Sequence, residues 1–89
     1  MLDDTRVLAT LQRYYLDDIT FEKAANDAGI TLYELIEYVK KNELPIVLTD
    51  EDRVEGIRKV SELMEKHGMK SALRIAEEAY QKVRARESP

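Results

Sequence analysis

The sequence contains no cysteine and no tryptophan, only one phenylalanine and only two prolines. Without thiols the chain forms neither a disulfide scaffold nor a thiolate metal site, which agrees with a reducing cytoplasm as the expected location. No apolar run approaches the roughly 20 residues that a membrane span needs. The acidic start MLDDTR lacks the basic and apolar regions of a signal peptide. We therefore expect a cytoplasmic protein that makes no contact with a membrane.

The motifs of the common enzyme classes are also missing. The sequence has no glycine-rich phosphate loop, no G-x-S-x-G and no H-E-x-x-H. Its single histidine, His67, precedes a glycine that ends a predicted helix, where capping explains it better than a role as base or ligand. Acidic pairs fall at predicted helix boundaries, where capping again explains them better than a cation does. We expect a non-enzyme with no catalytic residues, no metal and no cofactor.

Charge is distributed unevenly along the chain. The 89 residues, of which 44% are apolar and 36% charged, fit one globular domain at 1–89. Residues 1–48 carry five basic and nine acidic side chains, whereas residues 49–89 carry nine of each. The whole net charge of −4 therefore falls in the first half. Because Lys and Arg supply most of the non-specific affinity for DNA, this distribution argues against strong DNA binding by the isolated chain.

Apolar residues at helical spacing predict an all-α fold of about five helices. We expect helices to start at Asp3–Thr5, Thr20, Thr31, Thr49 and Lys70 or Ser71, and glycines to end two of them at Gly29 and Gly68. The apolar run LPIVLT suggests one short strand at 45–48. A helix-turn-helix half at 1–44 would then precede a C-terminal helical hairpin at 45–89, which serves dimerisation or partner binding. Tyr14, Tyr15 and Tyr38 are expected in the core with their hydroxyls in water.

The segment FEKAANDAGITLYELIEYVKK at 21–41 has the spacing of a helix-turn-helix. Ala25 is small where the second helix must cross close over the first. Gly29 supplies the turn, since a positive φ is easiest for a residue without Cβ. Leu35 is apolar where the two helices must pack, and Thr31 with Glu34 has the pattern of a capping box. This arrangement is typical of a DNA-reading unit whose second helix enters the major groove.

That second helix, at 31–41, supplies the candidate nucleic-acid contacts, which are Thr31, Tyr33, Lys40 and Lys41. Each has a second interpretation. The threonine also caps the helix, the two lysines also solvate its end, and the tyrosine is as well suited to packing as to contact. Double-stranded DNA is the ligand that this set of residues predicts.

The same helix also carries Glu34 and Glu37 and contains no arginine. Carboxylates on this face would repel DNA phosphates and attract a basic protein surface, such as the cleft of an RNA-binding toxin. These two residues are therefore the candidate contacts to a protein partner.

Residues 19–47, ITFEKAANDAGITLYELIEYVKKNELPIV, resemble the core of a family of short prokaryotic helix-turn-helix proteins that are similar to antitoxins. Lys23-Ala24-Ala25, Ala28-Gly29-Ile30-Thr31 and Leu44-Pro45-Ile46 occupy the places of the family's motifs, over about a third of the chain. The resemblance implies an antitoxin or small transcription regulator, often encoded beside a PIN-type ribonuclease toxin.

The C-terminal half has a weaker resemblance to a ribbon-helix-helix, in which a strand pairs with a second copy of the chain. Its run Pro45 to Leu48, the helix at 50–66 and the helix beginning KSALRIAEEAY occupy the corresponding places. The apolar strand positions disfavour base reading, however. A helical hairpin that covers the N-terminal core or pairs with a second chain is the preferred interpretation. Because a chain of this size is marginal alone, we expect a homodimer.

Two functions follow from these patterns. The first is a DNA-binding transcriptional regulator that is the antitoxin of a toxin–antitoxin pair. The alternative is a protein-interaction module that keeps the helix-turn-helix shape without binding DNA and uses its acidic surface. For both, a PIN-type ribonuclease toxin or another basic protein is the expected partner.

Overall fold

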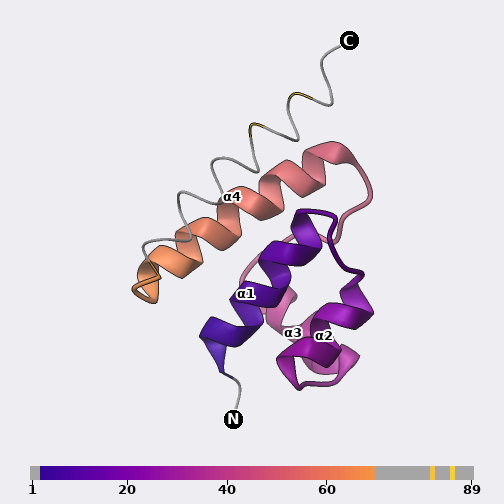
Figure 1. Ribbon diagram of the computed structural model, residues 1–89, viewed down its shortest axis with the longest axis vertical. Helices are drawn as coiled ribbons and strands as arrows, with labels where there is room; N and C mark the ends of the chain where they lie inside the picture. The colour runs from indigo at the N-terminus through magenta and orange to yellow at the C-terminus, as the bar shows by residue number, and fades with distance from the viewer. Residues whose placement is uncertain (1–2, 70–80, 82–84, 86–89) are drawn as a thin grey trace.

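The computed structural model describes residues 3–69 together with Gln81 and Ala85. These residues form four α-helices, which are α1 (Asp4–Tyr15), α2 (Phe21–Ala28), α3 (Leu32–Lys41) and α4 (Asp50–Lys66). Helix α1 packs against α2 on one side and against α4 on the other, and α4 runs in the opposite direction to α1 (Figure 1). The all-α prediction is confirmed for this part of the chain. The predicted fifth helix, and with it the C-terminal hairpin, lies outside the described residues.

At both ends of α1, side chains form hydrogen bonds with backbone groups. At its start, the Asp3 carboxylate accepts a hydrogen bond from the backbone N–H of Arg6. At its end, the guanidinium of Arg53 on α4 donates to the carbonyl oxygens of Tyr14 and Tyr15, at 3.1 Å each. The Tyr14 carbonyl also accepts a hydrogen bond from the backbone N–H of Asp17 at 3.1 Å. A cation at this end of α1 complements the negative end of the helix dipole. Arg53 thereby ties the end of α1 to the first turn of α4.

The turn between α2 and α3 has the predicted geometry. The Thr20 hydroxyl caps α2 through the N–H of Lys23, and Gly29 ends α2 in the left-handed conformation at φ 74°. The small side chains of α2 that face the other helices, Ala24, Ala25 and Ala28, are all buried. An alanine at these positions lets helices approach closely, and α2 and α3 are two short helices joined by the Gly29 turn.

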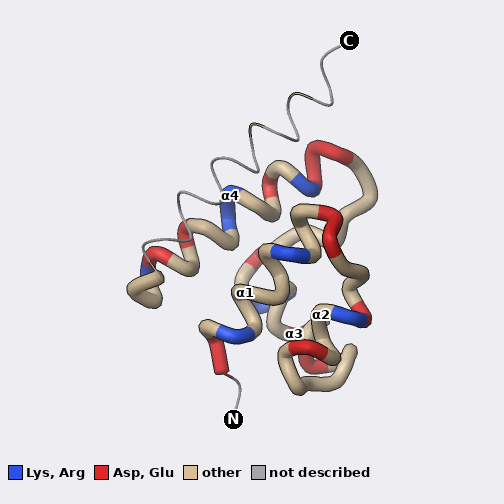
Figure 2. The backbone as a smooth tube through the Cα atoms, in the orientation of Figure 1, with Lys and Arg blue, Asp and Glu red and all other residues tan. Residues whose placement is uncertain are grey.

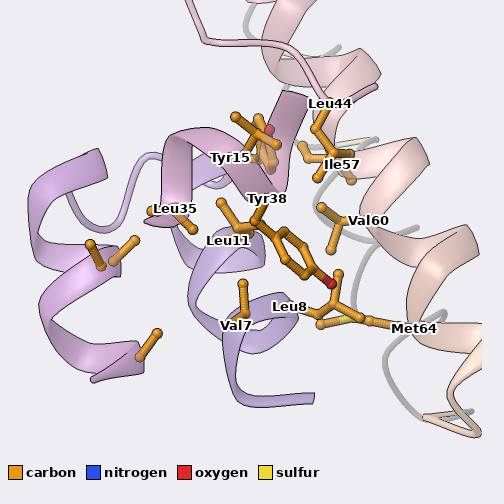
Figure 3. Close-up of a cluster of buried hydrophobic side chains, with 14 residues drawn as sticks. Val7, Leu8, Leu11, Tyr15, Leu35, Tyr38, Leu44, Ile57, Val60 and Met64 are labelled. Carbon is orange, nitrogen blue, oxygen red and sulfur yellow. The ribbon is translucent and has the colours of Figure 1, made fainter. Parts of the chain in front are cut away.

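The apolar core gathers between α1 and its neighbours. Figure 3 shows the α4 side chains Ile57, Val60 and Met64 facing α1. Near the middle of α4, the ring of Tyr15 lies directly on the backbone of Gly56, so that a Cβ at this position would overlap the ring. Tyr15 is fully buried, and the absence of a side chain at Gly56 provides the space for its ring. This close approach was not predicted from the sequence.

The segment at 45–48 is irregular and forms no strand within the described residues, so the strand prediction was wrong. Two tyrosines of α1 hold it instead. The Tyr15 hydroxyl donates to the carbonyl oxygen of Pro45 at 2.7 Å, and the Tyr14 hydroxyl accepts from the N–H of Val47 at 3.0 Å. These hydroxyls were expected in water, and the structure corrects this for both residues. The outward side chains Ile46 and Leu48 are 46% and 86% exposed.

Helix α4 begins with a second capping box. The Thr49 hydroxyl accepts from the N–H of Asp52, whose carboxylate accepts from the N–H groups of Leu48 and Thr49. Acidic residues gather at the starts of α1 and α4 (Figure 2), where the helix dipole favours negative charge. Gly68, at φ 76°, follows the end of the helix as predicted. Across residues 3–69, every helix is too short or too polar to traverse a lipid bilayer.

Candidate functional site

All six residues singled out from the sequence lie on α3 or at its N-cap, and all six are exposed. The structure therefore brings the proposed DNA contacts and the proposed protein contacts together on one helix. Their surroundings differ, however, and separate them into residues that complete the helix and residues whose side chains are open to a partner.

Thr31 and Glu34 form the capping box at the start of α3. The Thr31 hydroxyl accepts from the N–H of Glu34 at 3.1 Å, and the Glu34 carboxylate accepts from the N–H of Thr31 at 3.0 Å. The hydrogen bond from the Thr31 backbone, followed by that involving its side chain, lowers the pKa of Glu34 below the usual 4.5. Both residues thus have a structural duty, and the Glu34 carboxylate is a negative charge held in a fixed position.

Tyr33 and Glu37 are the open pair on α3. Their spacing of four residues places them one above the other on a helix face. The Tyr33 side chain is 70% exposed, which shows that it does not pack in the core, and Glu37 is exposed as well. Within the described residues, neither side chain makes a hydrogen bond or an ion pair. Their polar groups are therefore available to an external ligand.

A groove of about 790 Å³ runs beside this face and is lined by residues of α1, of α3 and of the C-terminal end of α4. It is lined by Asp4, Tyr33, Glu34, Glu37, Tyr38, Lys41, Asn42 and His67. Three carboxylates stand against one lysine, so the groove is acidic at neutral pH. Lys40, although exposed on α3, is not among the lining residues.

Asp4 of α1 and Tyr38 of α3 also line the groove. Tyr38 belongs to the core, as the sequence predicted, but its ring crosses toward α1 (Figure 3). Burial, followed by the charge of Asp4 and a hydrogen bond to its carboxylate, raises the pKa of Tyr38 to about 12. From the sequence alone, Asp4 is expected only to start a helix and His67 only to end one. Nothing local in the sequence indicates that they meet beside α3.

Three other cations gather on a different surface, between α1 and α2. The Asp27 carboxylate pairs with Lys23 at 3.0 Å and with Arg13 at 3.6 Å. The Arg6 side chain donates to the carbonyl oxygen of Asp27 at 3.0 Å. None of these three cations lines the groove. Lys40 and Lys41 are thus the two cations that α3 itself presents.

The described part of the chain holds no cluster of three or more acidic, histidine or cysteine side chains suited to a metal ion. Comparisons of the chain with protein-family models, with curated proteins and with solved structures found no match. The site must therefore be interpreted from its own geometry and charge.

Proposed function

We propose that this protein is a helix-turn-helix interaction module that binds a basic segment of another protein through α3. The observation that carries the proposal is the groove beside α3, which is lined by the carboxylates of Asp4, Glu34 and Glu37 and by the exposed ring of Tyr33. Complementary charge brings partners together and excludes partners of the same charge. An exposed tyrosine adds apolar contact area and a hydroxyl, and such residues are common in protein interfaces.

Charge favours a protein partner over DNA as the primary ligand. Residues 3–69 contain nine basic and fifteen acidic side chains, in alternating stretches along the tube of Figure 2. In a DNA-reading helix-turn-helix, the N-terminal part of the second helix contacts the base edges. On α3 this part presents Tyr33 and Glu34, Glu37 follows near the middle, and the two lysines lie at the opposite end. Few cations thus face the phosphates that would supply most of the affinity.

The resemblance to antitoxin-like proteins also supports a protein partner, and it indicates which partner to test first. Antitoxins of this kind are often encoded beside a PIN-type ribonuclease toxin, and a protein that handles RNA carries basic side chains. We therefore propose an antitoxin role in which the product of the adjacent gene is the partner.

The test is to co-express this chain with the product of the adjacent gene and to measure their affinity by isothermal titration calorimetry. Glu37→Lys should weaken the complex by about tenfold, because a repulsive charge replaces an attractive one. Glu51→Lys is the matched control. Glu51 lies in the first turn of α4, about 24 Å from His67 along the helix at 1.5 Å per residue.

A complex that tolerates Glu37→Lys and Glu51→Lys equally well would contradict binding through α3. Failure of the wild-type chain to bind the adjacent gene product would remove the proposed partner. Circular dichroism of each variant should retain the wild-type helical signal, so that loss of binding is not loss of fold.

A DNA-binding transcription regulator is the second candidate, and the exposure of Tyr33, Lys40 and Lys41 on α3 favours it. Fluorescence anisotropy with a duplex from the region upstream of the gene would test it across a range of salt concentrations. Replacing both lysines by glutamine should reduce the salt slope by about 2, one for each phosphate contact. No binding at low salt, with or without the protein partner, would exclude this candidate.

A further inference from the structure

We propose that the groove beside α3 receives an arginine side chain of the partner protein, with its guanidinium group between the Tyr33 ring and the Glu37 carboxylate. This inference rests on the proposed function, because it specifies the chemical group that α3 recognises. The occupant is identified by charge complementarity and by the shape of the two groups that are open in the groove.

Tyr33 and Glu37 provide two complementary surfaces for a guanidinium. They are four residues apart on α3, so their Cβ atoms are about 5–6 Å apart on the same helix face. A guanidinium is planar, and it can stack on an aromatic ring while its edge donates two hydrogen bonds to a carboxylate. Because neither side chain has a partner within the described residues, no existing interaction must be broken first.

The surrounding charges favour a cation at this point. Glu34 is held in its capping box with its carboxylate at the groove, and Asp4 faces the groove from α1. Both contribute negative potential without being displaced. An anion would meet three carboxylates, whereas a cation would meet only Lys41 as a like charge.

Among the described residues that line the groove, Lys41 is the lysine that could compete for Glu37. It follows Glu37 by four residues, which is a favourable spacing for an ion pair on a helix. The described residues show no such pair within 4.0 Å, and both side chains line the groove separately. Glu37 thus remains open to an external cation. Arginine is favoured over lysine because an ammonium group is compact and strongly hydrated and cannot stack as a plane on the tyrosine ring.

The experiment is a titration of the isotope-labelled full chain, followed by nuclear magnetic resonance, with three short peptides. The peptides have the sequence acetyl-Gly-Gly-X-Gly-Gly-amide, where X is arginine, lysine or citrulline. Citrulline has nearly the shape of arginine without its charge. We expect the arginine peptide to shift the amide signals of Tyr33, Glu37 and Asp4 in a saturable way. The citrulline peptide should bind at least about fivefold more weakly, because it loses the charge-assisted hydrogen bonds.

Two variants test the two surfaces separately. Glu37→Gln removes the charge and Tyr33→Leu removes the ring, and each should weaken the arginine peptide by about threefold, the effect of one exposed contact. Glu51→Gln, in the first turn of α4, should leave its binding unchanged. Equal binding of arginine and citrulline peptides, or shifts confined to residues away from the groove, would overturn the inference. So would a Glu37→Gln variant that binds the arginine peptide as well as the wild type does.

The same variants distinguish failure of this inference from failure of the proposed function. If the adjacent gene product binds the wild type, Glu37→Gln and Tyr33→Leu with equal affinity, the arginine site is wrong although the protein is still an interaction module. If the arginine peptide binds as expected but the adjacent gene product does not, the arginine site is upheld and the proposed partner is wrong.

Discussion

Glycine inside a helix usually weakens it by about 1 kcal/mol relative to alanine. Gly56 nevertheless occupies the middle of α4, and the ring of Tyr15 explains why. The ring packs on the bare backbone at this position, so the entropic disadvantage of glycine is offset by burial of a large aromatic side chain. A residue that looks unfavourable for its own helix is therefore required by the neighbouring one.

We predict that Gly56→Ala lowers the free energy of unfolding by about 1–3 kcal/mol, because the added methyl group forces the Tyr15 ring to move in a packed core. Urea denaturation followed by circular dichroism measures this change. Glu65→Ala is the control, since Glu65 is exposed on the same helix, and it should change stability by less than about 0.5 kcal/mol. A stabilised Gly56→Ala variant would show that the ring does not depend on this glycine.

At the scale of the element, helix boundaries could be predicted because their causes lie within a few residues of each other. The Thr31–Glu34 and Thr49–Asp52 boxes both form as their spacing indicated. The segment at 45–48 could not be predicted in this way. Its backbone partners are the hydroxyls of Tyr14 and Tyr15, about thirty residues earlier in the chain, and β-branched residues alone suggest a strand.

The candidate site also has one part that could be predicted from the sequence and one part that could not. The exposure of Tyr33 and Glu37 follows from helical periodicity once the core face of α3 is known. The groove does not follow from it, because Asp4 and His67 come from the start of α1 and the end of α4. Which helix ends meet depends on how the helices cross in three dimensions, and the sequence around each end carries no signal of that meeting.

The capping boxes predict a loss of stability in acid. Hydrogen bonds from the Thr31 backbone and side chain lower the pKa of Glu34 below 4.5, and those from the Leu48 and Thr49 backbones lower the pKa of Asp52 below 3.8. Because the folded-state pKa values are the lower ones, these carboxylates stabilise the fold above the unfolded values. That contribution is lost as the pH falls through the folded values.

Urea denaturation between about pH 6 and pH 3 should therefore show the free energy of unfolding falling with pH, most steeply below the ordinary carboxyl range. The variant with both Glu34→Gln and Asp52→Asn should show a shallower fall and lower stability at neutral pH. Glu65→Gln, which changes an exposed acid outside the caps, serves as the control. Parallel pH profiles for the wild type and the double variant would contradict this role of the caps.

The tyrosine tethers give a prediction for the segment at 45–48. Tyr14→Phe removes the acceptor for the N–H of Val47, so hydrogen exchange at that amide should become faster. Tyr15→Phe removes the donor to the Pro45 carbonyl and should lower global stability by about 1–2 kcal/mol, because a part-buried acceptor is left unpaired. Exchange at Leu11, inside α1, is the internal reference. Unchanged exchange at Val47 in Tyr14→Phe would mean that the tether does not hold the segment.

At the scale of the whole molecule, α1 is the helix that joins the two parts of the fold. It packs on the helix-turn-helix side through α2 and on the other side against α4 (Figure 1). The chain also leaves apolar side chains in solvent next to this joint, with Leu48 86% exposed and Ile46 46% exposed. Exposed apolar groups of this kind are candidates for contact with a second chain.

We predict a homodimer in solution that depends on these two side chains. Light scattering should give twice the monomer mass for the wild type and a lower mass for the variant with Ile46→Asp and Leu48→Asp. Because both side chains point away from the core, the double variant should remain folded. Its control is Glu51→Asp, a conservative change in the nearby first turn of α4. A monomeric wild type at all concentrations would refute the homodimer.

The contact between Tyr15 and Gly56 also determines how α1 and α4 can align as the protein folds. A slip of α4 by one residue would place Glu55 or Ile57 under the ring, and each of them carries a side chain that needs the same space. Either side chain would overlap the ring, so the packing of Tyr15 on α4 requires the register that places Gly56 beneath it. The absence of a side chain at Gly56 thus helps to set the register between α1 and α4. The apolar stripe of α4 alone would not distinguish this register from its neighbours.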